Sequence, residues 1–509
     1  MSHQPINRIV IVGGGTAGWM AAAIMSQAFQ GRLSIELVES EEIGTVGVGE
    51  ATIPQIAMFN EYLKFDEHDF IARTNGSMKL GIEFVNWGQL GDRYIHTFGH
   101  IGQDKDLIGF HHYWLRARTL GLKNSMWDYS IHAYASNANK FERLRNYGNH
   151  SQMGYAYHFD AALYARFLRD YAEQRGVRRT EGKIKDVHVH GESGHVTHVT
   201  LESGRDVEGE LFLDCSGFRG LLIEGALKTG YENWSHLLPC DRALAVPCES
   251  VSPLTPFTRS TARKAGWQWR IPLQHRIGNG HVYCSSFISD DEAASILMAN
   301  LDGKPLADPK PLKFVTGKRK KAWNKNVVSL GLASGFLEPL ESTSIHLIQS
   351  GLARLMQLFP NKDFNPADID QFNAETDVEY EMIRDFLVLH YHLNQRTDSE
   401  FWIHCREMPV PETLTHRMEL FAANGRIHQD RRDLFSEPSW LQVLVGQNLI
   451  PRGYNPIAEN MDPNDLFTYL AAIKSAQMRA VSGMPLHADW LAKNAPAKYE
   501  LVMPKSAAA

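Results

Sequence analysis

The sequence has few cysteines, no long apolar run and no block of charge of one sign. Its five cysteines, Cys215, Cys240, Cys248, Cys284 and Cys405, are an odd number without a CxxC pair, so we expect reduced thiols rather than a zinc site or a redox dithiol. The N-terminus runs directly into a short apolar segment broken by glycines, unlike a signal peptide or a membrane span. These absences favour a cytoplasmic protein without a membrane segment.

The charge balance argues against a nucleic-acid partner. The chain has 52 Lys+Arg and 58 Asp+Glu, a formal net charge of -6 spread without long blocks. The exception is the run Lys318–Lys321, which we interpret as a solvated face, with attraction of an anionic cofactor or a partner protein as the alternative. With 43% apolar and 22% charged residues, the 509-residue chain has the composition of an ordinary globular protein of two to four domains, or of one large body with interleaved segments.

The first forty residues have the pattern of a dinucleotide-binding unit. Ile9–Val12 is predicted to form a strand, Gly13–Gly18 a tight turn and Trp19–Met25 a helix, and a second strand over Leu33–Val38 ends in Glu39. Glycines let the backbone approach a pyrophosphate, and an acid at this spacing accepts hydrogen bonds from a ribose diol. The unit therefore predicts a nucleotide site, with a glycine-rich turn that binds nothing as the alternative.

The remainder of the chain alternates strand and helix patterns and then becomes helical. We predict a helix over Phe159–Arg175, strands within Ile184–Glu202, Glu210–Gly217 and residues 239–289, and helices over Ser342–Phe359 and Asp368–Asn394. The nucleotide-binding domain is then discontinuous, and a helical region packs on it after about residue 360. The sequence has no internal repeat and no second GxGxxG that would bind a second nucleotide.

Four segments have residue types that can carry chemistry. Lys79 lies in a β-like apolar run, where a solvent-facing lysine is the favoured interpretation and a desolvated amine the alternative. Trp267 and Trp269 would share one face of a strand, usually as core packing. The segment Gly47–Pro54 could by itself be an ordinary loop. The helix after Glu341 has exposed N–H groups that Ser342 or Thr343 could cap or a small anion could occupy.

Histidines do not form a predicted metal site. The pairs His188-x-His190 and His390-x-His392 and the neighbours His111 and His112 have no Cys or acid at a spacing that would complete a ligand set. We interpret them as packing or surface residues and expect no metal.

Together, these segments resemble the flavin-dependent halogenases of the tryptophan halogenase family. The resemblance extends from Ile9 to about Pro456 and rests on the glycine turn, the loop Gly47–Pro54, Lys79, the Trp-x-Trp-x-Ile-Pro motif at Trp267–Pro272 and the segment Phe336–Thr343. It implies an α/β fold with an FAD-binding, GR2-type Rossmann-like domain, as in flavin monooxygenases. Residues 1–360 would form this halogenase body with an inserted substrate-side β-sheet, and residues 361–509 a mainly helical region covering the substrate pocket.

The resemblance also implies roles for individual residues. FAD, as FADH2, would be held by Gly13, Gly15, Thr16, Ala17, Gly18, Glu39, Gly49, Val187, Leu332 and Ile345. Thr343 and Ser344 would bind chloride or bromide, and Trp267 and Trp269 would wall the flavin off from the substrate. Hypohalous acid made from FADH2, oxygen and halide would reach Lys79, while Glu341 would stabilise the cationic intermediate or remove its proton. Most relatives have glycine at the position of Ser344, which leaves the halide preference open.

His96 and Phe98 match the positions that sandwich the substrate ring in the family, with buried aromatic packing as the alternative. Free-tryptophan halogenases carry a tyrosine pair in their late helical region, and Glu437–Pro451 lacks one. We therefore expect an indole without an amino-acid head, or a larger indole- or phenol-bearing molecule.

A separate NAD(P)H-dependent flavin reductase is an expected partner, and a homodimer is compatible with the sequence. The competing hypotheses are an aromatic hydroxylase and a flavin-binding protein that has lost catalysis.

Overall fold

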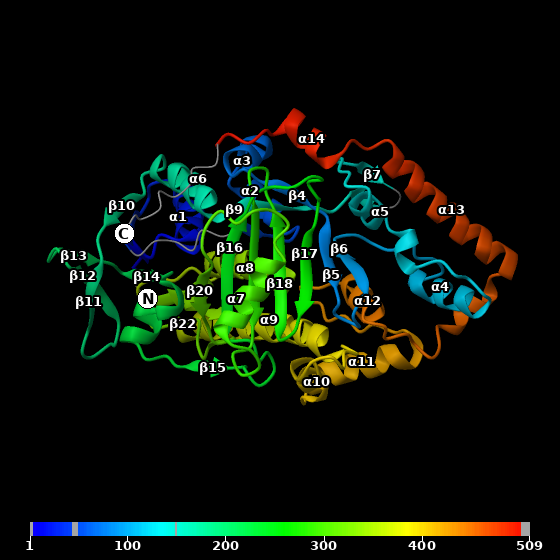
Figure 1. Cartoon of the computed structure of the whole chain (residues 1–509). Helices are drawn as coiled ribbons and strands as arrows, with labels where there is room; N and C mark the ends of the chain where they lie inside the picture. Colours follow the sequence, from blue (N-terminus) through cyan, green and yellow to red (C-terminus); the bar gives the residue numbers. More distant parts are fainter. Residues whose placement is uncertain (1–3, 43–48, 148–149, 500–509) are drawn as a thin grey trace. The chain divides into compact units, whose positions relative to one another are not determined.

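The computed structural model describes residues 4–42, 49–147 and 150–499 (Figure 1). The chain forms two compact units, each built from three segments. Unit 1 comprises Met1–Gly76, Phe159–Asp241 and Leu312–Glu381; unit 2 comprises Ser77–His158, Arg242–Pro311 and Met382–Ala509. The boundary predicted between residues 360 and 361 falls inside the third segment of unit 1, and the functional division that it describes stays a prediction.

A six-stranded sheet forms the centre of unit 1, in the order β10-β2-β1-β14-β23-β22. Its strands are β10 (Arg178–Glu181), β2 (Ser34–Glu39), β1 (Arg8–Val12), β14 (Leu211–Asp214), β23 (Val327–Ser329) and β22 (Trp323–Asn324). All neighbours pair in parallel except β22, which is antiparallel to β23. The apolar residues of β1, β2 and β14 are buried, as expected for a parallel sheet covered on both faces. The predicted order of strand, turn, helix and strand at the N-terminus is confirmed, although the helix begins at Thr16, three residues earlier than predicted, and extends to Phe29.

Helices complete this α/β architecture. α1 (Thr16–Phe29) packs against α6 (Ala161–Glu173) and α8 (Ser344–Gln357). The helix predicted over Phe159–Arg175 begins two residues later than expected, because Phe159 belongs to β9 (Ala156–Asp160). Asp160 then caps the helix, since its carboxylate accepts hydrogen bonds from the N–H groups of Ala162 and Leu163.

Smaller elements surround the sheet of unit 1. They are β3 (Gly49–Ala51), α2 (Ile56–Tyr62), α3 (Glu67–Arg73), β11 (Ile184–Val189), β12 (Val196–Leu201), β13 (Asp206–Glu208), η2 (Gly217–Arg219), η3 (Leu221–Ala226), β15 (Tyr231–Asn233), β21 (Gly317–Arg319), η4 (Gly331–Ala333), β24 (Gly335–Phe336), η5 (Pro339–Glu341) and the first part of α9 (Pro366–His392). The strands predicted within Ile184–Glu202 are β11 and β12, which pair antiparallel.

The interpretation of Lys318–Lys321 as a solvated face is wrong for its first two residues. Lys318 and Arg319 lie on β21, the middle strand of the sheet β15-β21-β24, and are buried. The Lys318 ammonium forms ion pairs with Asp377 at 2.6 Å and with Glu232 at 3.1 Å, and Arg319 pairs with Glu224 at 2.8 Å. Their charges are therefore compensated inside the protein rather than offered to a partner.

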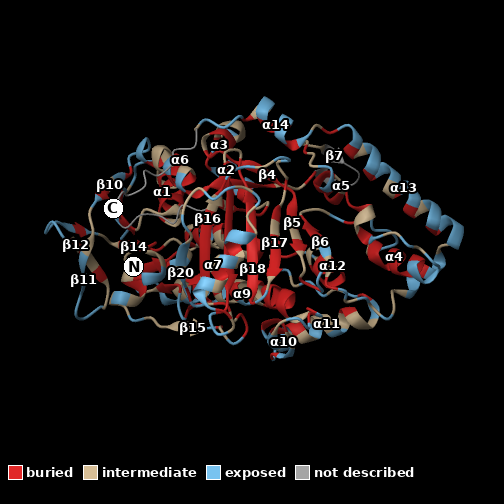
Figure 2. Ribbon diagram, viewed as in Figure 1, coloured by how far each residue is buried: buried red, intermediate tan, exposed pale blue. Residues whose placement is uncertain are grey.

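The main sheet of unit 2 has the order β20-β16-β19-β18-β17-β5-β6. Its strands are β20 (Lys310–Lys313), β16 (Arg242–Cys248), β19 (Ile277–Tyr283), β18 (Gly266–Pro272), β17 (Thr258–Arg263), β5 (Gly81–Val85) and β6 (Arg93–Thr97). The strands predicted between residues 239 and 289 are thus confirmed as four neighbours. Figure 2 shows the central strands as buried, and every residue of β18 and β19 is buried.

This sheet has two chemically different faces, because residues paired across adjacent strands point to the same side. Trp269 pairs with Ser260, Ser260 with Phe84, and Phe84 with Tyr94. We call this side, which carries Trp267, Trp269, Ile82, Phe84, Tyr94 and His96, the aromatic face. The next row pairs Glu83 with Arg259, Arg259 with Arg270 and Arg270 with Asn279. We call this side, which carries Glu83, Arg259, Arg263, Gln268, Arg270, Asn279 and His281, the charged face.

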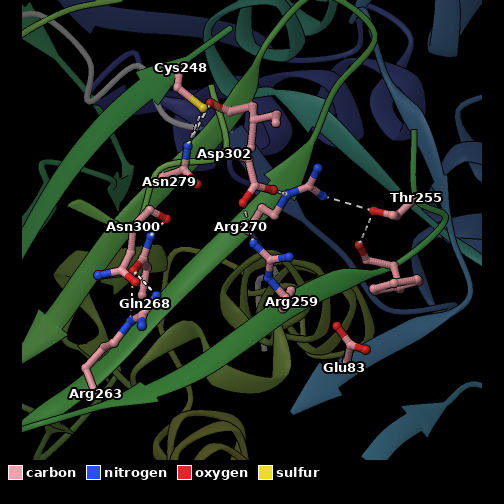
Figure 3. A network of polar contacts seen from close by, with 12 residues as sticks. Glu83, Cys248, Thr255, Arg259, Arg263, Gln268, Arg270, Asn279, Asn300 and Asp302 are labelled. Atoms are coloured by element: carbon pink, nitrogen blue, oxygen red, sulfur yellow. Dashed lines mark hydrogen bonds and ion pairs between the residues drawn. The ribbon is translucent and has the colours of Figure 1, made fainter. Parts of the chain in front are cut away.

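The charged face is held by a network of ion pairs and hydrogen bonds (Figure 3). The Asp302 carboxylate accepts a hydrogen bond from Arg259 at 2.8 Å and also pairs with Arg270. Arg270 donates to the Thr255 hydroxyl at 3.0 Å. Helix α7 (Asp290–Ala299) covers the central strands (Figure 1), and its Ala293 carbonyl lies 3.1 Å from His281 Nδ1. Polar side chains are tolerated on this face because they bind one another.

The remaining elements of unit 2 are mainly helical. They are β4 (Ser77–Lys79), α4 (Phe110–Thr119), η1 (Met126–Tyr129), α5 (Ile131–Asn137), β7 (Arg145–Tyr147), β8 (His150–Gln152), the last part of α9, α10 (Glu400–Glu407), α11 (Glu412–Asn424), α12 (Glu437–Gly446), η6 (Pro456–Asn460), α13 (Pro463–Ser482) and α14 (His487–Asn494). The long helix α13 packs on α4 and α5, with its outer face exposed (Figures 1 and 2). Of the helices in the described ranges, none is both long and apolar enough to cross a membrane.

Candidate functional site

The glycine turn of unit 1 is shaped by close backbone contacts. Gly13 has a φ of 109°, and a side chain there would clash with the Cys215 carbonyl oxygen. A side chain at Gly18 would clash with the Gly13 carbonyl oxygen, so both glycines are needed for the turn to close. Gly15 differs, because a Cβ there would meet no atom within 4 Å. The N-cap of α1 is Gly15, and no side chain caps this helix.

Glu39 lies at the carboxyl end of β2, next to this turn. A side chain at Gly14 would overlap Glu39 Oε2, so the carboxylate and the turn are in close approach. Arg179 Nε donates to the other carboxylate oxygen, Oε1, at 2.5 Å. The open side of Gly15, the uncapped helix N-terminus and this carboxylate fit the pyrophosphate and ribose of FAD in chemistry and in order along the chain.

The other predicted flavin contacts fall in three places. Gly331, with a φ of 61°, would bring a Cβ within 2.9 Å of the Ala17 side chain, so the loop that carries Leu332 packs on the start of α1. Leu332 is 38% exposed, whereas Ile345 in the first turn of α8 is buried. Val187 is partly buried against a core cluster that includes Val10 and Val12. Gly49 begins β3, but Gly47 and Val48 lie outside the described residues.

Glu50 is a residue that the sequence did not single out. It follows Gly49 in β3, and burial raises its pKa from 4.5 to about 7. The sequence signal that could have identified Glu50 is its position as the one acid among glycine and apolar residues in Gly-Val-Gly-Glu-Ala-Thr-Ile-Pro. A carboxyl group with such a pKa carries a proton over much of the range below pH 7.

The segment from Glu341 to Ser344 forms an uncapped helix start. Glu341 is fully buried at the end of η5, and Ser342 adopts a left-handed conformation with a φ of 60°. Thr343 is the N-cap of α8, yet its side chain forms no cap hydrogen bond, so capping by this hydroxyl, one of the predicted alternatives, is wrong. Among the described residues, no group bonds the buried Thr343 Oγ1. The N–H groups of this 14-residue helix suit a small anion.

Lys79 is fully buried in unit 2, so the favoured expectation of a solvent-facing lysine is wrong. It ends β4, which pairs antiparallel with β9 and is buried over its whole length. The Lys79 Nζ lies 5.1 Å from the centre of the Phe98 ring, a cation–π contact. A lysine with no exposed surface is rare in proteins and costs desolvation energy, which favours the desolvated amine named as the alternative.

The predicted ring-binding and wall residues lie on the aromatic face. Trp267 and Trp269 are buried, with ring centres 6.1 Å apart. His96 is 2% exposed and meets Phe386 edge-on at 5.8 Å between ring centres. Phe98, one residue beyond β6, is half-buried. The structure therefore brings Lys79 to Phe98 and places His96 on the same sheet face as the two tryptophans.

The predicted residues thus fall into two sets. Unit 1 holds the nucleotide and halide set with Glu341, and unit 2 holds Lys79, the aromatic residues and the tryptophans. The histidine pairs noted in the sequence have structural partners: His188 stacks on His198 at 4.1 Å, His390 Nδ1 contacts the Phe386 carbonyl at 2.8 Å, and His111 Nε2 contacts the Gly425 carbonyl at 2.7 Å. In the described part of the chain, no three His, Cys, Asp or Glu side chains gather as metal ligands would.

The parallel sheet, the glycine turn and Glu39 define an α/β protein of the dinucleotide-binding class. Comparison with known proteins gives the family. The sequence model described as tryptophan halogenase matches residues 8–463. Tryptophan 7-halogenase RebH of Lentzea aerocolonigenes is 32% identical over 94% of this chain and 97% of its own, and tryptophan 6-halogenase ThaL of Streptomyces albogriseolus is 34% identical over 89% and 91%.

Solved structures agree with this match. A flavin-dependent halogenase from Xanthomonas campestris superposes with a TM-score of 0.95 and 47% identity, covering 98% of this chain and 100% of that chain. BrvH, a flavin-dependent halogenase from Brevundimonas sp., gives a TM-score of 0.92 and 46% identity over 96% and 99%. This chain belongs to the tryptophan halogenase family, and it is an enzyme of the flavin-dependent halogenase class. The predicted fold class is confirmed.

Proposed function

We propose that this enzyme uses FADH2, oxygen and chloride or bromide to halogenate an electron-rich aromatic substrate of the indole type. The observation that carries the proposal is the complete burial of Lys79 against the Phe98 ring. A lysine without exposed surface is rare, and burying its side chain costs desolvation energy. Its presence beside an aromatic residue suits a group that directs an electrophile toward an aromatic carbon.

The flavin would be held by the glycine turn and Glu39. N–H groups at the start of α1 would bind the pyrophosphate, and Glu39 the ribose hydroxyls. FADH2 would supply the two electrons that convert oxygen and halide into hypohalous acid and water. Because no second GxGxxG exists in the sequence, we assign its reduction to a separate NAD(P)H-dependent reductase.

Lys79 would act on the oxidant. Its ammonium donates a hydrogen bond to the oxygen of hypohalous acid and so polarises the oxygen–halogen bond; a haloamine formed on the neutral amine is the second route. The halogen is then transferred to the aromatic carbon, the carbon–hydrogen bond releases a proton, and that proton and the hydroxide form water. Atoms balance as arene plus hypohalous acid giving haloarene plus water.

Supporting roles fall to the remaining predicted residues. Glu341, fully buried, would stabilise the cationic ring intermediate or accept its proton. Backbone N–H groups at Thr343 and Ser344 would bind the halide, for which the uncapped start of α8 is suited. Trp267 and Trp269 would separate flavin from substrate, so that oxygen is not transferred directly to the arene.

The late helical region supports a substrate without an amino-acid head. Gln442 of α12 accepts hydrogen bonds from the N–H and the hydroxyl of Thr97, each at 2.9 Å. Gln447 donates to the His390 carbonyl at 2.9 Å. The Gln442 amide is thus bound to Thr97, which lies between His96 and Phe98 in the sequence. We therefore propose indole, or a larger indole- or phenol-bearing molecule, rather than free tryptophan.

The test is a product analysis with defined components. The enzyme, a flavin reductase, NADH, FAD and oxygen are incubated with indole, tryptophan or phenols and with chloride or bromide, and products are identified by mass spectrometry. We expect a monohalogenated indole whose formation requires halide. A hydroxylated product formed without halide would instead establish an aromatic hydroxylase, and no product across a broad arene panel would favour a flavin-binding protein without catalysis.

A further inference from the structure

We propose that His158 is a positioning residue for Lys79, and that its loss releases hypohalous acid into solution instead of delivering it to the arene. This inference rests on the proposed role of Lys79. Nothing in the sequence indicates it, because His158 belongs to no motif and lies 79 positions after the lysine. It emerges from a chain of hydrogen bonds that runs through the buried interior of unit 2 beside β4.

The chain fixes the proton positions on His158. The Ser77 hydroxyl donates to the Pro272 carbonyl oxygen at 2.5 Å, and a carbonyl can only accept. Ser77 Oγ must therefore accept from His158 Nδ1, which lies 3.0 Å away and carries the proton. His158 Nε2 then accepts from the Thr258 hydroxyl at 2.9 Å. Every donor in this series has one acceptor, and the imidazole is neutral.

The electrostatic surroundings keep it neutral. Burial lowers the pKa of His158 well below 6.5, and the nearby positive charges of Lys79 and Arg270 lower it further. A second positive charge beside the Lys79 ammonium is thus avoided. Protonation of His158 would turn Nε2 into a donor and reverse its hydrogen bond with the Thr258 hydroxyl.

The chain connects the lysine to the tryptophan strand. Ser77 and Lys79 are two apart on β4, so their side chains point to one side, and Ser77 is paired with His158 of β9. The acceptor Pro272 is the last residue of β18, which also holds Trp267 and Trp269. His158 therefore fixes the position of Lys79 relative to the strand that carries the two tryptophans.

A second histidine, His487, binds Met78, the residue between Ser77 and Lys79. His487 Nε2 accepts from the N–H of Met78 at 3.0 Å, and its Nδ1 lies 3.1 Å from the Leu254 carbonyl oxygen. Burial lowers the pKa of His487 to about 4, so this ring is also neutral near pH 7. Two neutral histidines thus anchor the two residues that precede Lys79.

We predict how much hypohalous acid is released into solution and how much halogenates the arene. In His158→Phe the ring volume is kept and both hydrogen bonds are lost. We expect the ratio of hypohalous acid released to FADH2 oxidised to rise at least fivefold, with haloarene per FADH2 falling by about tenfold, while FADH2 oxidation stays within twofold of wild type. Released hypohalous acid is measured with monochlorodimedone as a trap. His158→Asn can still donate to Ser77 and should recover part of the yield.

Controls separate positioning from general damage. His281→Phe removes an equally buried histidine from the charged face and should leave the partition unchanged. If His158→Phe fails to fold, Thr258→Val, which removes only the donor to Nε2, should give a smaller release in the same direction. The inference is overturned if His158→Phe gives the same ratio of released hypohalous acid to haloarene as wild type. If His158→Phe does not fold, the same result in Thr258→Val overturns it. If wild type makes no haloarene and Lys79→Met leaves the released acid unchanged, the proposed function itself fails, whatever the behaviour of His158.

Discussion

The two faces of the seven-stranded sheet in unit 2 use burial in opposite ways. On the charged face, the buried ions are compensated: Asp302 binds both Arg259 and Arg270, and Gln268 accepts two hydrogen bonds from Arg263. The aromatic face packs rings on rings, as in the stack of Phe84 on Tyr94 with centres 4.9 Å apart. On the charged face, buried groups of opposite charge pair with each other and so stabilise the sheet. The tryptophans and His96, which are predicted to act in the reaction, lie on the opposite face.

The largest expected effect follows from breaking the charged face. Asp302→Ala leaves the buried Arg270 and the partly exposed Arg259 without their shared carboxylate. We expect a loss of about 3 kcal/mol in the free energy of unfolding, the lower end of the range for a broken buried pair. Chemical denaturation measures it. Halogenation per folded molecule should not change, because the aromatic face does not contain these groups. A loss below about 1 kcal/mol would show that solvent already compensates the two guanidinium groups.

Acid should act on the charged face and on the region beside β4. Burial lowers the pKa of His281 on the charged face, and of His487 beside β4, from 6.5 to about 4. Because their folded pKa is depressed, the stability that these neutral rings contribute is present above pH 6.5 and is lost as the pH falls toward 4. Each should add about 1.4 kcal/mol per pH unit to the slope of unfolding free energy in that range, or about 3 kcal/mol in all.

Matched variants sharpen this comparison. His281→Gln and His487→Gln should each reduce the slope by the same amount, as measured by denaturation between pH 4 and pH 7. Only His487→Gln should also raise the release of hypohalous acid at pH 7. Equal release from both variants would mean that the two histidines do not differ in function.

A smaller effect is expected from crowding the aromatic face. A side chain at Gly280 would overlap the Trp269 ring, which lies across this glycine. Gly280→Ala should therefore displace the indole and destabilise the protein by about 1–3 kcal/mol. Trp269 fluorescence should shift, and the yield of haloarene per FADH2 should fall more than stability alone explains. An unchanged yield would separate Trp269 from the proposed wall between flavin and substrate.

Local patterns predicted the nucleotide-binding part well. β1, α1 and β2 follow from residues close in sequence, so their periodicity and glycine spacing were sufficient. The burial of Lys79 could not be predicted in this way, because it depends on the pairing of β4 with β9, about 77 residues later. The prediction of an exposed Lys318 was wrong for the same reason, because its partners Glu232 and Asp377 are far away in sequence.

Family resemblance supplied what local patterns could not. It drew attention to Lys79 and Glu341 although periodicity favoured an exposed lysine. It did not indicate His158, whose proposed role rests on hydrogen bonds between distant segments, and it did not single out Glu50 within the loop Gly47–Pro54, whose pKa is raised by burial. Single polar residues outside a motif acquire meaning only when their three-dimensional partners are known.

The most direct measurement is the fate of oxidised halogen in Lys79→Met, a substitution that removes the ammonium and keeps the length of the apolar chain. With FADH2, oxygen, bromide and indole, we predict bound FAD and normal FADH2 oxidation, haloindole reduced at least a thousandfold, and nearly all oxidised bromide captured by the trap. Bromoindole formed at the wild-type yield by Lys79→Met would contradict the account, because the buried amine would then have no part in delivering the halogen.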